Sequence, residues 1–313
     1  MVEKVLITGG AGFIGSHIVE SLLNKGNYVV VIDNLSTGSE ERIENHLKNP
    51  RFKFHKVDLL GEGIEKYFEG VDSVFHLAAN PEVKLVKEET KTHIEQNVLV
   101  TYNVLEAVRK TKVKKFFFTS TSTVYGEAKK LPTPEDYSPK LPISLYGASK
   151  LACESLISAF SASFGINCMI FRLANIIGGR STHGVIYDFV KKLKINPKRL
   201  EIFGNGEQNK SYMHVEECVR AMLFCARKQK GSLEIYNIGS EDQLKVVDIA
   251  KIVCEEGGLS SVKFDLTGGI RGWGGDVPIM ILDINKLKSL GFRPSMGSGE
   301  SVRLTAKEIW GGR

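Results

Sequence analysis

The segment Thr8-Gly9-Gly10-Ala11-Gly12-Phe13-Ile14-Gly15 joins a short apolar run to an amphipathic segment. Gly9, Gly12 and Gly15 have the spacing GxxGxxG. Glycine has no Cβ, so its backbone can turn sharply and approach a pyrophosphate closely, and the amides at a helix N-terminus attract negative charge. Because the triplet stands between a strand pattern and a helix pattern, it predicts a dinucleotide-binding turn.

Short β-branched runs alternate with amphipathic stretches on both sides of this turn. The expected buried strands are residues 4–8, 28–33, 52–56, 73–77 and 115–120, and the expected helices are residues 14–24 and 92–110. This alternation predicts an α/β fold: a Rossmann-type doubly wound parallel sheet with helices on both faces.

The chain changes character after a proline cluster at residues 132–142, which predicts a loop because proline can neither donate to a ladder nor continue a helix. A helix over residues 144–164 and a strand over residues 168–173 are expected next. Beyond them the alternation becomes irregular, which predicts a smaller C-terminal α/β lobe. We therefore expect a Rossmann domain over residues 1–175, to which about 212–240 return with a strand at 234–238, and a lobe over residues 176–211 and 241–313.

The composition is that of an ordinary globular protein, with 42% hydrophobic and 25% charged residues among 313. No run approaches the roughly 18 apolar residues of a membrane span, and the N-terminus lacks the pattern of a secretory signal. The five cysteines are an odd number and form no CxxC pair, so neither a disulfide framework nor a zinc cluster is expected. These features predict a cytoplasmic protein with no metal site and no membrane partner.

The formal net charge is +6, and basic clusters at residues 191–194 and 227–230 could suggest nucleic-acid binding. The clusters have no neighbouring aromatic platform on which bases could stack, and their spacing suits the solvated side of a helix. We therefore expect no nucleic-acid partner. A mild positive excess still favours capture of a small polyanion.

An acidic residue, Asp33, ends the second expected strand, 18 residues beyond Gly15. A carboxylate at this place can accept hydrogen bonds from a ribose diol and would repel the extra phosphate of NADP. No arginine occurs in the following loop, residues 34–38. The sequence therefore favours NAD over NADP; the alternative is a solvent-exposed turn aspartate.

A tyrosine and a lysine four residues apart, Tyr146 and Lys150, open the expected long helix and so share one of its faces. A free tyrosine has a pKa of about 10 and is a poor base near neutral pH. A neighbouring ammonium and an oxidised nicotinamide would both favour the phenolate. A YxxxK pair is also common by chance, and an exposed pair on a solvated helix is the alternative.

A run of hydroxyls, Thr119-Ser120-Thr121-Ser122-Thr123, follows the apolar residues 116–118 and precedes Val124-Tyr125-Gly126. Hydroxyls at the carboxyl end of a parallel strand face the crevice where such sheets bind ligands. A Ser/Thr-rich turn without a ligand is the alternative. Together with the glycine turn and the Tyr–Lys pair, the run predicts a dinucleotide-dependent active site.

At these motifs the sequence resembles the extended short-chain dehydrogenase/reductase family and, within it, the UDP-galactose (UDP-glucose) 4-epimerases. The likeness runs over nearly the whole chain. It rests on residues 8–17, Asp33-Asn34, Asp58-Leu59, His76-Leu77-Ala78-Ala79, Asn97, residues 121–126, Tyr146–Lys150, Arg172-Leu173-Ala174-Asn175, residues 202–206, Tyr212-Met213-His214-Val215 and residues 271–278.

The resemblance implies roles for individual residues. Thr121, Tyr146 and Lys150 would be catalytic, with Thr121 relaying a proton between the sugar hydroxyl and Tyr146. NAD would contact Gly9, Gly12, Phe13, Ile14, Gly15, Asp33, Asn34, Ser36, Thr37, Gly38, Asp58, Leu59, Leu77, Ala78, Ala79, Asn97, Tyr146, Lys150 and Ala174. The nucleotide sugar would contact Thr121, Ser122, Tyr146, Asn175, Val185, Ile186, Phe203, Lys210, Arg271 and Asp276.

The chain departs from the family pattern at two places. Lys210 stands where many relatives have an arginine, so the phosphate contact there is expected to be looser. The stretch from Arg271 to Asp276 is longer than in the commonest version, which puts the alignment of Asp276 in doubt.

The resemblance also bears on the reaction. Related sugar dehydratases and uronic-acid decarboxylases typically place a glutamate directly before Val-Tyr-Gly, because elimination or decarboxylation needs a further acid–base group. Here that position is Thr123, preceded by Ser122. The resemblance thus implies NAD-dependent epimerisation at carbon 4 of a UDP-hexose, interconverting UDP-glucose and UDP-galactose. Tyr146 would take the 4-hydroxyl proton through Thr121, and a hydride would pass to NAD and return to the other face of a 4-keto sugar.

Other interpretations stay open. The chain could be another nucleotide-sugar epimerase, acting on a uronic acid or an N-acetylhexosamine, or a nucleotide-sugar dehydratase. It could also be a non-catalytic NAD-sensing protein, although a sensor needs no base and the Thr121, Tyr146 and Lys150 set is intact. The resemblance further implies a homodimer, formed through a four-helix bundle of helices near residues 92–110 and 144–164.

Overall fold

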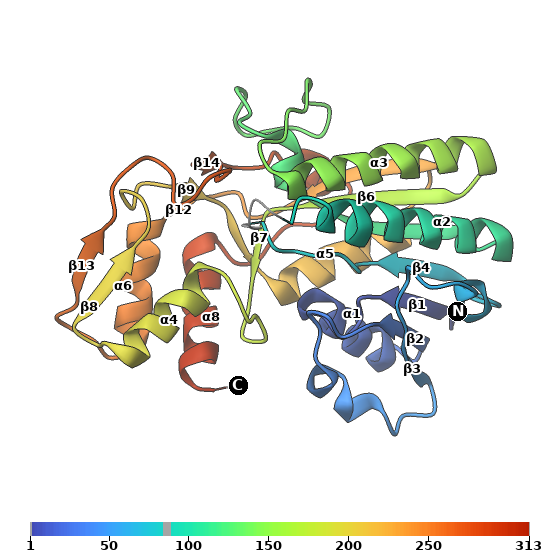
Figure 1. The fold of residues 1–313 in the computed structure, drawn as a ribbon, viewed down its shortest axis with the longest axis horizontal. Helices are drawn as coiled ribbons and strands as arrows, with labels where there is room; N and C mark the ends of the chain where they lie inside the picture. The colour runs from blue at the N-terminus through green and yellow to red at the C-terminus, as the bar shows by residue number, and fades with distance from the viewer. Residues whose placement is uncertain (1, 84–88, 313) are drawn as a thin grey trace. The chain divides into compact units, whose positions relative to one another are not determined.

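The computed structural model describes residues 2–83 and 89–312. These residues fall into two compact units (Figure 1). Among the described residues, the first comprises 2–83, 89–124, 145–172 and 222–236, and the second comprises 125–144, 173–221 and 237–312. No helix in the described ranges is both long and apolar enough to cross a membrane.

A seven-stranded sheet in the order β11-β6-β5-β4-β1-β2-β3 is the centre of the first unit. Its strands are β1 (Lys4–Thr8), β2 (Tyr28–Asp33), β3 (Phe52–Lys56), β4 (Ser73–His76), β5 (Lys115–Thr121), β6 (Asn167–Leu173) and β11 (Leu233–Ile238). The pairings of β1 with β2 and β4, of β2 with β3 and of β4 with β5 are all parallel. This order confirms the doubly wound α/β fold, and β11 is the strand at one edge of the sheet, beside β6.

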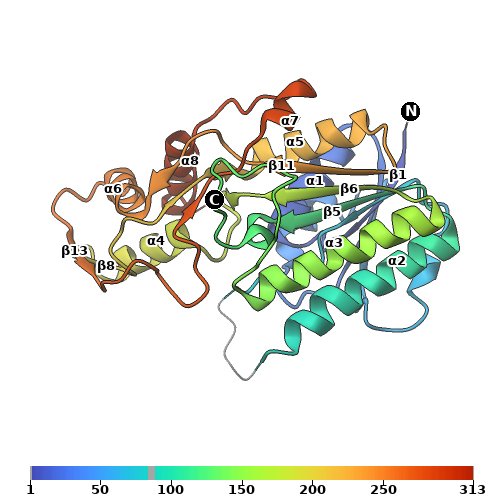
Figure 2. The same ribbon diagram turned by 90° about the horizontal axis from the view of Figure 1, so that it is seen from above.

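Continuous apolar runs account for the central strands. Val29, Val30, Val31 and Ile32 of β2 are all buried, as expected where helices cover both faces of a parallel sheet. Helices α2 (Val100–Thr111) and α3 (Leu145–Phe164) lie side by side on one face, and α1 (Phe13–Asn24) covers the other (Figure 2). The apolar faces of α2 and α3 pack with the sheet in a core that includes Leu6, Phe116 and Ile157, and α1 buries Ile18, Val19, Leu22 and Leu23.

The helix expected over residues 92–110 is interrupted. Residues Ile94–Leu99 form a π-helical segment, η4, and the α-helix α2 begins only at Val100. A π-helical turn inside a helix is uncommon and often marks a functional site. Here it carries Asn97, whose side-chain amide donates to Ser149 Oγ at 2.9 Å and whose Oδ1 accepts from the backbone of Asn80 at 2.7 Å.

The second unit has its own core between helices and short strands. Helices α4 (Val185–Ile195), α6 (Val246–Glu256) and α8 (Ser298–Trp310) pack around it. The remaining elements that lie wholly in this unit are β7 (Asn175–Ile177) with β10 (Tyr212–His214), β8 (Arg199–Ile202) with β13 (Lys263–Leu266), β9 (Asn209–Lys210) with β12 (Leu244–Lys245) and β14 (Ile279–Met280), and the helix α7 (Asn285–Ser289). Helix α5 (Val215–Lys228) is shared between the units.

Candidate functional site

The glycine turn lies between β1 and α1, with Gly9 at φ +72°. A Cβ added to Gly9 would lie 2.7 Å from the backbone nitrogen of Ala78, and one added to Gly15 would lie 2.2 Å from the Gly9 carbonyl oxygen. In the described chain no side chain caps α1, and its first turn holds no acidic residue. The first-turn amides therefore remain available to an anion such as a pyrophosphate.

The carboxylate of Asp33 is buried at the end of β2. Its oxygens accept hydrogen bonds from the backbone of Ala11 at 3.0 Å and of Leu35 at 2.8 Å. Burial raises the pKa of Asp33, while these two bonds and the charge of Arg42 lower it. Sequence reasoning missed Arg42, which donates to the Ala11 carbonyl at 3.3 Å, because only residues 34–38 were examined for a cation.

The residues expected to contact a dinucleotide follow the carboxyl ends of adjacent strands. Residues 9–15 follow β1, 33–38 end and follow β2, 58–59 follow β3, and 77–79 follow β4. Carboxyl ends of parallel strands meet at one edge of a sheet, which is where such folds bind ligands. With its glycine cradle, its uncapped helix and a carboxylate fixed beside the turn, this edge fits an NAD molecule.

The side chains of Leu59 and Asn97, both assigned to this cleft, are buried and contact other parts of the first unit. Leu59 lies in the core of the first unit, 5% exposed. Asn97 is 1% exposed, and its amide holds Asn80 and Ser149. In the structure these side chains support the edge of the sheet from within.

Lys150 is buried on α3 and points at the end of β5. Its Nζ donates to the Thr119 carbonyl oxygen at 2.9 Å and lies 4.6 Å from the centre of the Phe118 ring. Thr121, the last residue of β5, accepts hydrogen bonds from the backbone and the hydroxyl of Thr123, both at 3.2 Å. The unit thus brings the hydroxyl run and the helix of the Tyr–Lys pair together.

Burial dominates the protonation of the Tyr–Lys pair. It raises the pKa of Tyr146 to about 12 and lowers the pKa of Lys150 to about 8. Neighbouring positive charges favour the phenolate, as expected from the sequence, but desolvation opposes it. In the chain by itself the phenol is therefore protonated at neutral pH, and acting as a base requires further positive charge bound beside it.

His93 is a buried residue near Tyr146 that was not predicted from the sequence. Its ring centre lies 5.8 Å from that of Tyr146, and its Nδ1 lies 3.3 Å from the side-chain nitrogen of Asn97. Burial lowers the pKa of His93, so the imidazole is neutral at physiological pH. It packs beside the tyrosine without adding charge.

The second unit contains a charged cluster around Asp276. This carboxylate forms an ion pair with Lys210 and accepts from the Gly272 backbone at 3.0 Å. Arg271 donates to the Asp276 carbonyl oxygen at 2.5 Å and forms an ion pair with Glu127 at 2.8 Å. The structure therefore brings together three expected substrate residues, and it adds Glu127.

The other expected residues of this unit are more scattered. Asn175 donates to the Ser211 carbonyl oxygen at 2.9 Å. The ring of Phe203 is 46% exposed, with Lys192 Nζ 4.3 Å from its centre. Ala174 and Ile186 are buried, Ile186 in the core of the unit, while Val185 packs partly buried against the same core.

Comparison with known proteins adds an independent line of observation. Residues 5–239 match the family described as "NAD dependent epimerase/dehydratase family". A putative UDP-glucose 4-epimerase of Methanocaldococcus jannaschii is 34% identical over 307 residues, 96% of each chain.

Solved structures are similar over the whole length. A crystal structure of UDP-galactose 4-epimerase is 42% identical with a TM-score of 0.88, covering 99% of both chains. The UDP-glucuronic acid 4-epimerase of Bacillus cereus, in complex with UDP-glucuronic acid and NAD, is 30% identical with a TM-score of 0.90, covering 99% of this chain and 100% of that one. A UDP-N-acetylglucosamine 4-epimerase from Methanobrevibacter ruminantium M1 is 29% identical with a TM-score of 0.89, covering 100% of this chain and 99% of that one, so three sugar classes are represented among similar structures.

Proposed function

Because the chain belongs to the NAD dependent epimerase/dehydratase family, we propose that it interconverts UDP-glucose and UDP-galactose by transient oxidation at carbon 4. The chain is an enzyme of this family, and its cofactor is NAD. The observation that carries the choice of reaction is the end of β5, where Thr121, Ser122 and Thr123 offer only hydroxyls. Glu154, which contacts β5 through Ser120, is held in a buried ion pair with Arg172, so it is not available as the extra acid that an elimination needs.

In the proposed reaction, residues of the first unit bind the cofactor and transfer the proton. The amides of the glycine turn hold the pyrophosphate, and Asp33 accepts hydrogen bonds from the adenosine ribose. NAD, when bound, supplies the hydride acceptor and donor. Tyr146 takes the proton of the sugar 4-hydroxyl through Thr121 and later returns it, while the Lys150 ammonium holds the nicotinamide ribose and favours the phenolate.

We assign nucleotide-sugar binding to the second unit. Lys210 and Arg271 supply cations for the diphosphate, and the exposed ring of Phe203 supplies a surface for the uracil. The ion pair of Lys210 with Asp276 holds the ammonium in one place. A lysine is a point charge where an arginine would offer a planar fork, so the grip on the phosphate is less directional.

The substrate class is tested by comparing kcat/KM for UDP-glucose, UDP-glucuronic acid and UDP-N-acetylglucosamine. We expect the neutral hexose to be preferred at least about tenfold, the scale of one substituent contact. A UDP-uronic acid epimerase is the second candidate, because the similar structure with UDP-glucuronic acid has a TM-score of 0.90. Faster turnover of either other sugar would overturn the hexose assignment, and release of water would indicate a dehydratase.

We also propose a homodimer. The outer face of α3 carries small residues at alternating spacings of four and three, Ala148, Ala152, Ser155, Ala159 and Ala162. Beside it, Ile94, Leu99 and Tyr102 are 51%, 45% and 44% exposed. Small residues allow close helix packing, and a second copy would cover the apolar side chains. Sedimentation equilibrium should give twice the mass of 34.6 kDa; a monomer at micromolar concentration would refute this.

Replacing Asp33 with alanine should weaken NAD binding at least about tenfold, since a charged hydrogen bond to a ribose diol contributes about 1.5–3 kcal/mol. Wild-type protein should carry NAD through gel filtration, and the variant should lose it. The matched control is Asp72→Ala, because Asp72 accepts from the Lys4 backbone at the opposite edge of the sheet. Retention of NADP by the wild type would contradict the assignment.

A further inference from the structure

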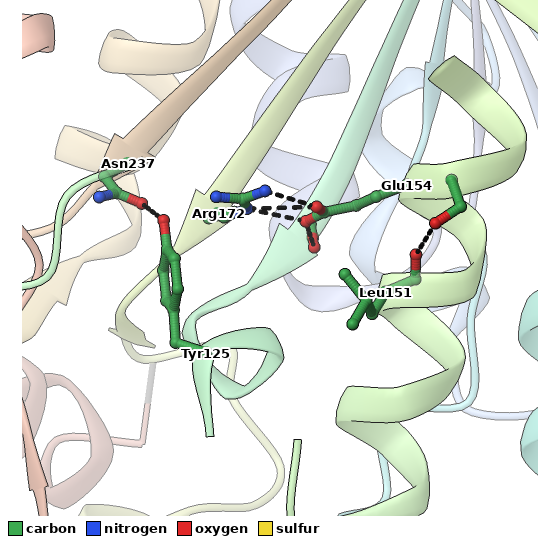
Figure 3. A network of polar contacts seen from close by, with 7 residues as sticks. Tyr125, Leu151, Glu154, Arg172 and Asn237 are labelled. Carbon is green, nitrogen blue, oxygen red and sulfur yellow. Dashed lines mark hydrogen bonds and ion pairs between the residues drawn. The ribbon is translucent and has the colours of Figure 1, made fainter. Parts of the chain in front are cut away.

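A buried ion pair connects α3, the helix that carries the Tyr–Lys pair, to β6. Arg172 Nη2 lies 2.7 Å from Glu154 Oε2, and Arg172 Nε donates to Glu154 Oε1 at 3.0 Å (Figure 3). The two side chains are 2% and 6% exposed. Ser120 on β5 donates a third hydrogen bond to Glu154 Oε1 at 2.5 Å. The carboxylate is therefore fixed by two elements, although removing charges from water is costly.

Glu154 stands one helical turn after Lys150, so the two side chains share a face of α3. Ser120, which Glu154 holds, is adjacent in the strand to Thr119, whose carbonyl oxygen accepts from Lys150. The Glu154 carboxylate thus bears on Lys150 in two ways. Its charge acts on the ammonium through a dry interior, and its hydrogen bond fixes the strand that the ammonium contacts.

The other titratable groups around Lys150 are neutral at physiological pH. Burial raises the pKa values of Tyr146 and Cys153 and lowers those of His76 and His93. Arg172 faces Glu154 from β6. Cys153 and Glu154 are the two described groups whose negative forms would favour the Lys150 ammonium. Burial keeps the Cys153 thiol protonated, whereas Glu154 is ion-paired with Arg172 as a carboxylate.

We propose that Glu154 and Arg172 form a positioning pair for Lys150. The negative charge of Glu154 keeps the buried lysine in its ammonium form, and Arg172 prevents Glu154 from leaving Ser120 to pair with the lysine itself. Lys150 then stays on the Thr119 carbonyl with its charge available to Tyr146. This inference rests on the proposed function in one respect: the catalytic role of the Lys150 ammonium beside Tyr146.

The test separates charge from packing. Glu154→Gln alone takes the negative charge of Glu154 away from the buried Arg172 guanidinium, so that variant is expected to be unstable. The double variant Glu154→Gln with Arg172→Met removes both charges and keeps an acceptor for Ser120. Ser120→Ala is the matched control, because it removes the hydrogen bond and keeps both charges.

The readout is the titration of Lys150 in the full chain, followed by NMR of protein labelled at lysine Cε and Nζ. The signal is assigned by its absence in Lys150→Met. In the double variant we expect the pKa of Lys150 to fall from its wild-type value by about one unit, the scale on which a neighbouring opposite charge acts. The Ser120→Ala variant should change the value less than the double variant does, because it loses the hydrogen bond to the strand and keeps the charge of Glu154. The basic limb of the kcat profile should move to lower pH by the same amount.

A purely structural role gives a different result. If the double variant is folded and Lys150 titrates as in the wild type, the positioning role is wrong. Because the NMR titration needs no turnover, it stands even if no UDP-sugar is epimerised. Failure of the proposed function would appear instead as an inactive wild type with the expected titration.

Discussion

Replacing Tyr146 with phenylalanine should lower kcat at least about a hundredfold, the usual scale of acid–base catalysis. The change removes the hydroxyl that accepts the proton of the sugar and keeps the ring that packs 5.8 Å from His93. Binding of NAD and of UDP should therefore survive. The two quantities are measured as kcat with UDP-galactose and as the dissociation constant for UDP by calorimetry.

The matched control for this variant is Tyr28→Phe. Tyr28 begins β2, at the amino end of the strand and therefore away from the ligand-binding edge, and it is 49% exposed. Its loss of a hydroxyl should leave kcat unchanged. Activity of Tyr146→Phe close to that of the control would remove Tyr146 from the mechanism.

Replacing Gly15 with alanine should abolish NAD retention and destabilise the fold by about 1–3 kcal/mol, the usual cost of overpacking. The new Cβ would lie 2.2 Å from the Gly9 carbonyl oxygen and 2.8 Å from the Cα of Gly10, so the turn must open. An opened turn no longer presents its amides to a pyrophosphate. Thermal unfolding and the cofactor content after gel filtration measure the two effects.

Gly299 provides the control for this substitution. It lies in α8, and a Cβ there would meet no atom within 4 Å. Alanine at an open helical position should be neutral or slightly stabilising. If Gly15→Ala retained NAD as Gly299→Ala does, the glycine turn would not be the cofactor cradle.

Most of the parallel sheet could be predicted because its strands are nearly continuous apolar runs. The strands 4–8, 28–33 and 52–56 have the expected bounds. The π-helical segment at Ile94–Leu99 could not be predicted, because it depends on contacts of Asn97 with Asn80 and Ser149. Such contacts between distant residues leave no periodicity in the sequence.

In the candidate site, too, some residues could be predicted from the sequence and others could not. Motifs pointed to Lys150 and Asp33 because chemistry requires those residue types next to a glycine turn. Glu127 was missed because its partner, Arg271, is 144 residues away. Glu154 was missed because its partner, Arg172, lies on a different element, the strand β6. The sequence separation of neither pair, Glu127–Arg271 or Glu154–Arg172, indicates an ion pair. The direction of the Tyr146 shift depends on burial, which a motif does not report.

The central claim is that carbon 4 is oxidised and re-reduced by one bound cofactor. The most direct measurement is incubation of the purified protein with UDP-galactose in deuterated water, without added NAD, followed by proton spectra of the anomeric and carbon-4 positions. We expect UDP-glucose to appear until equilibrium is reached, with the proton at carbon 4 retained. Absence of conversion by protein that carries NAD, or deuterium at carbon 4 of the product, would contradict it.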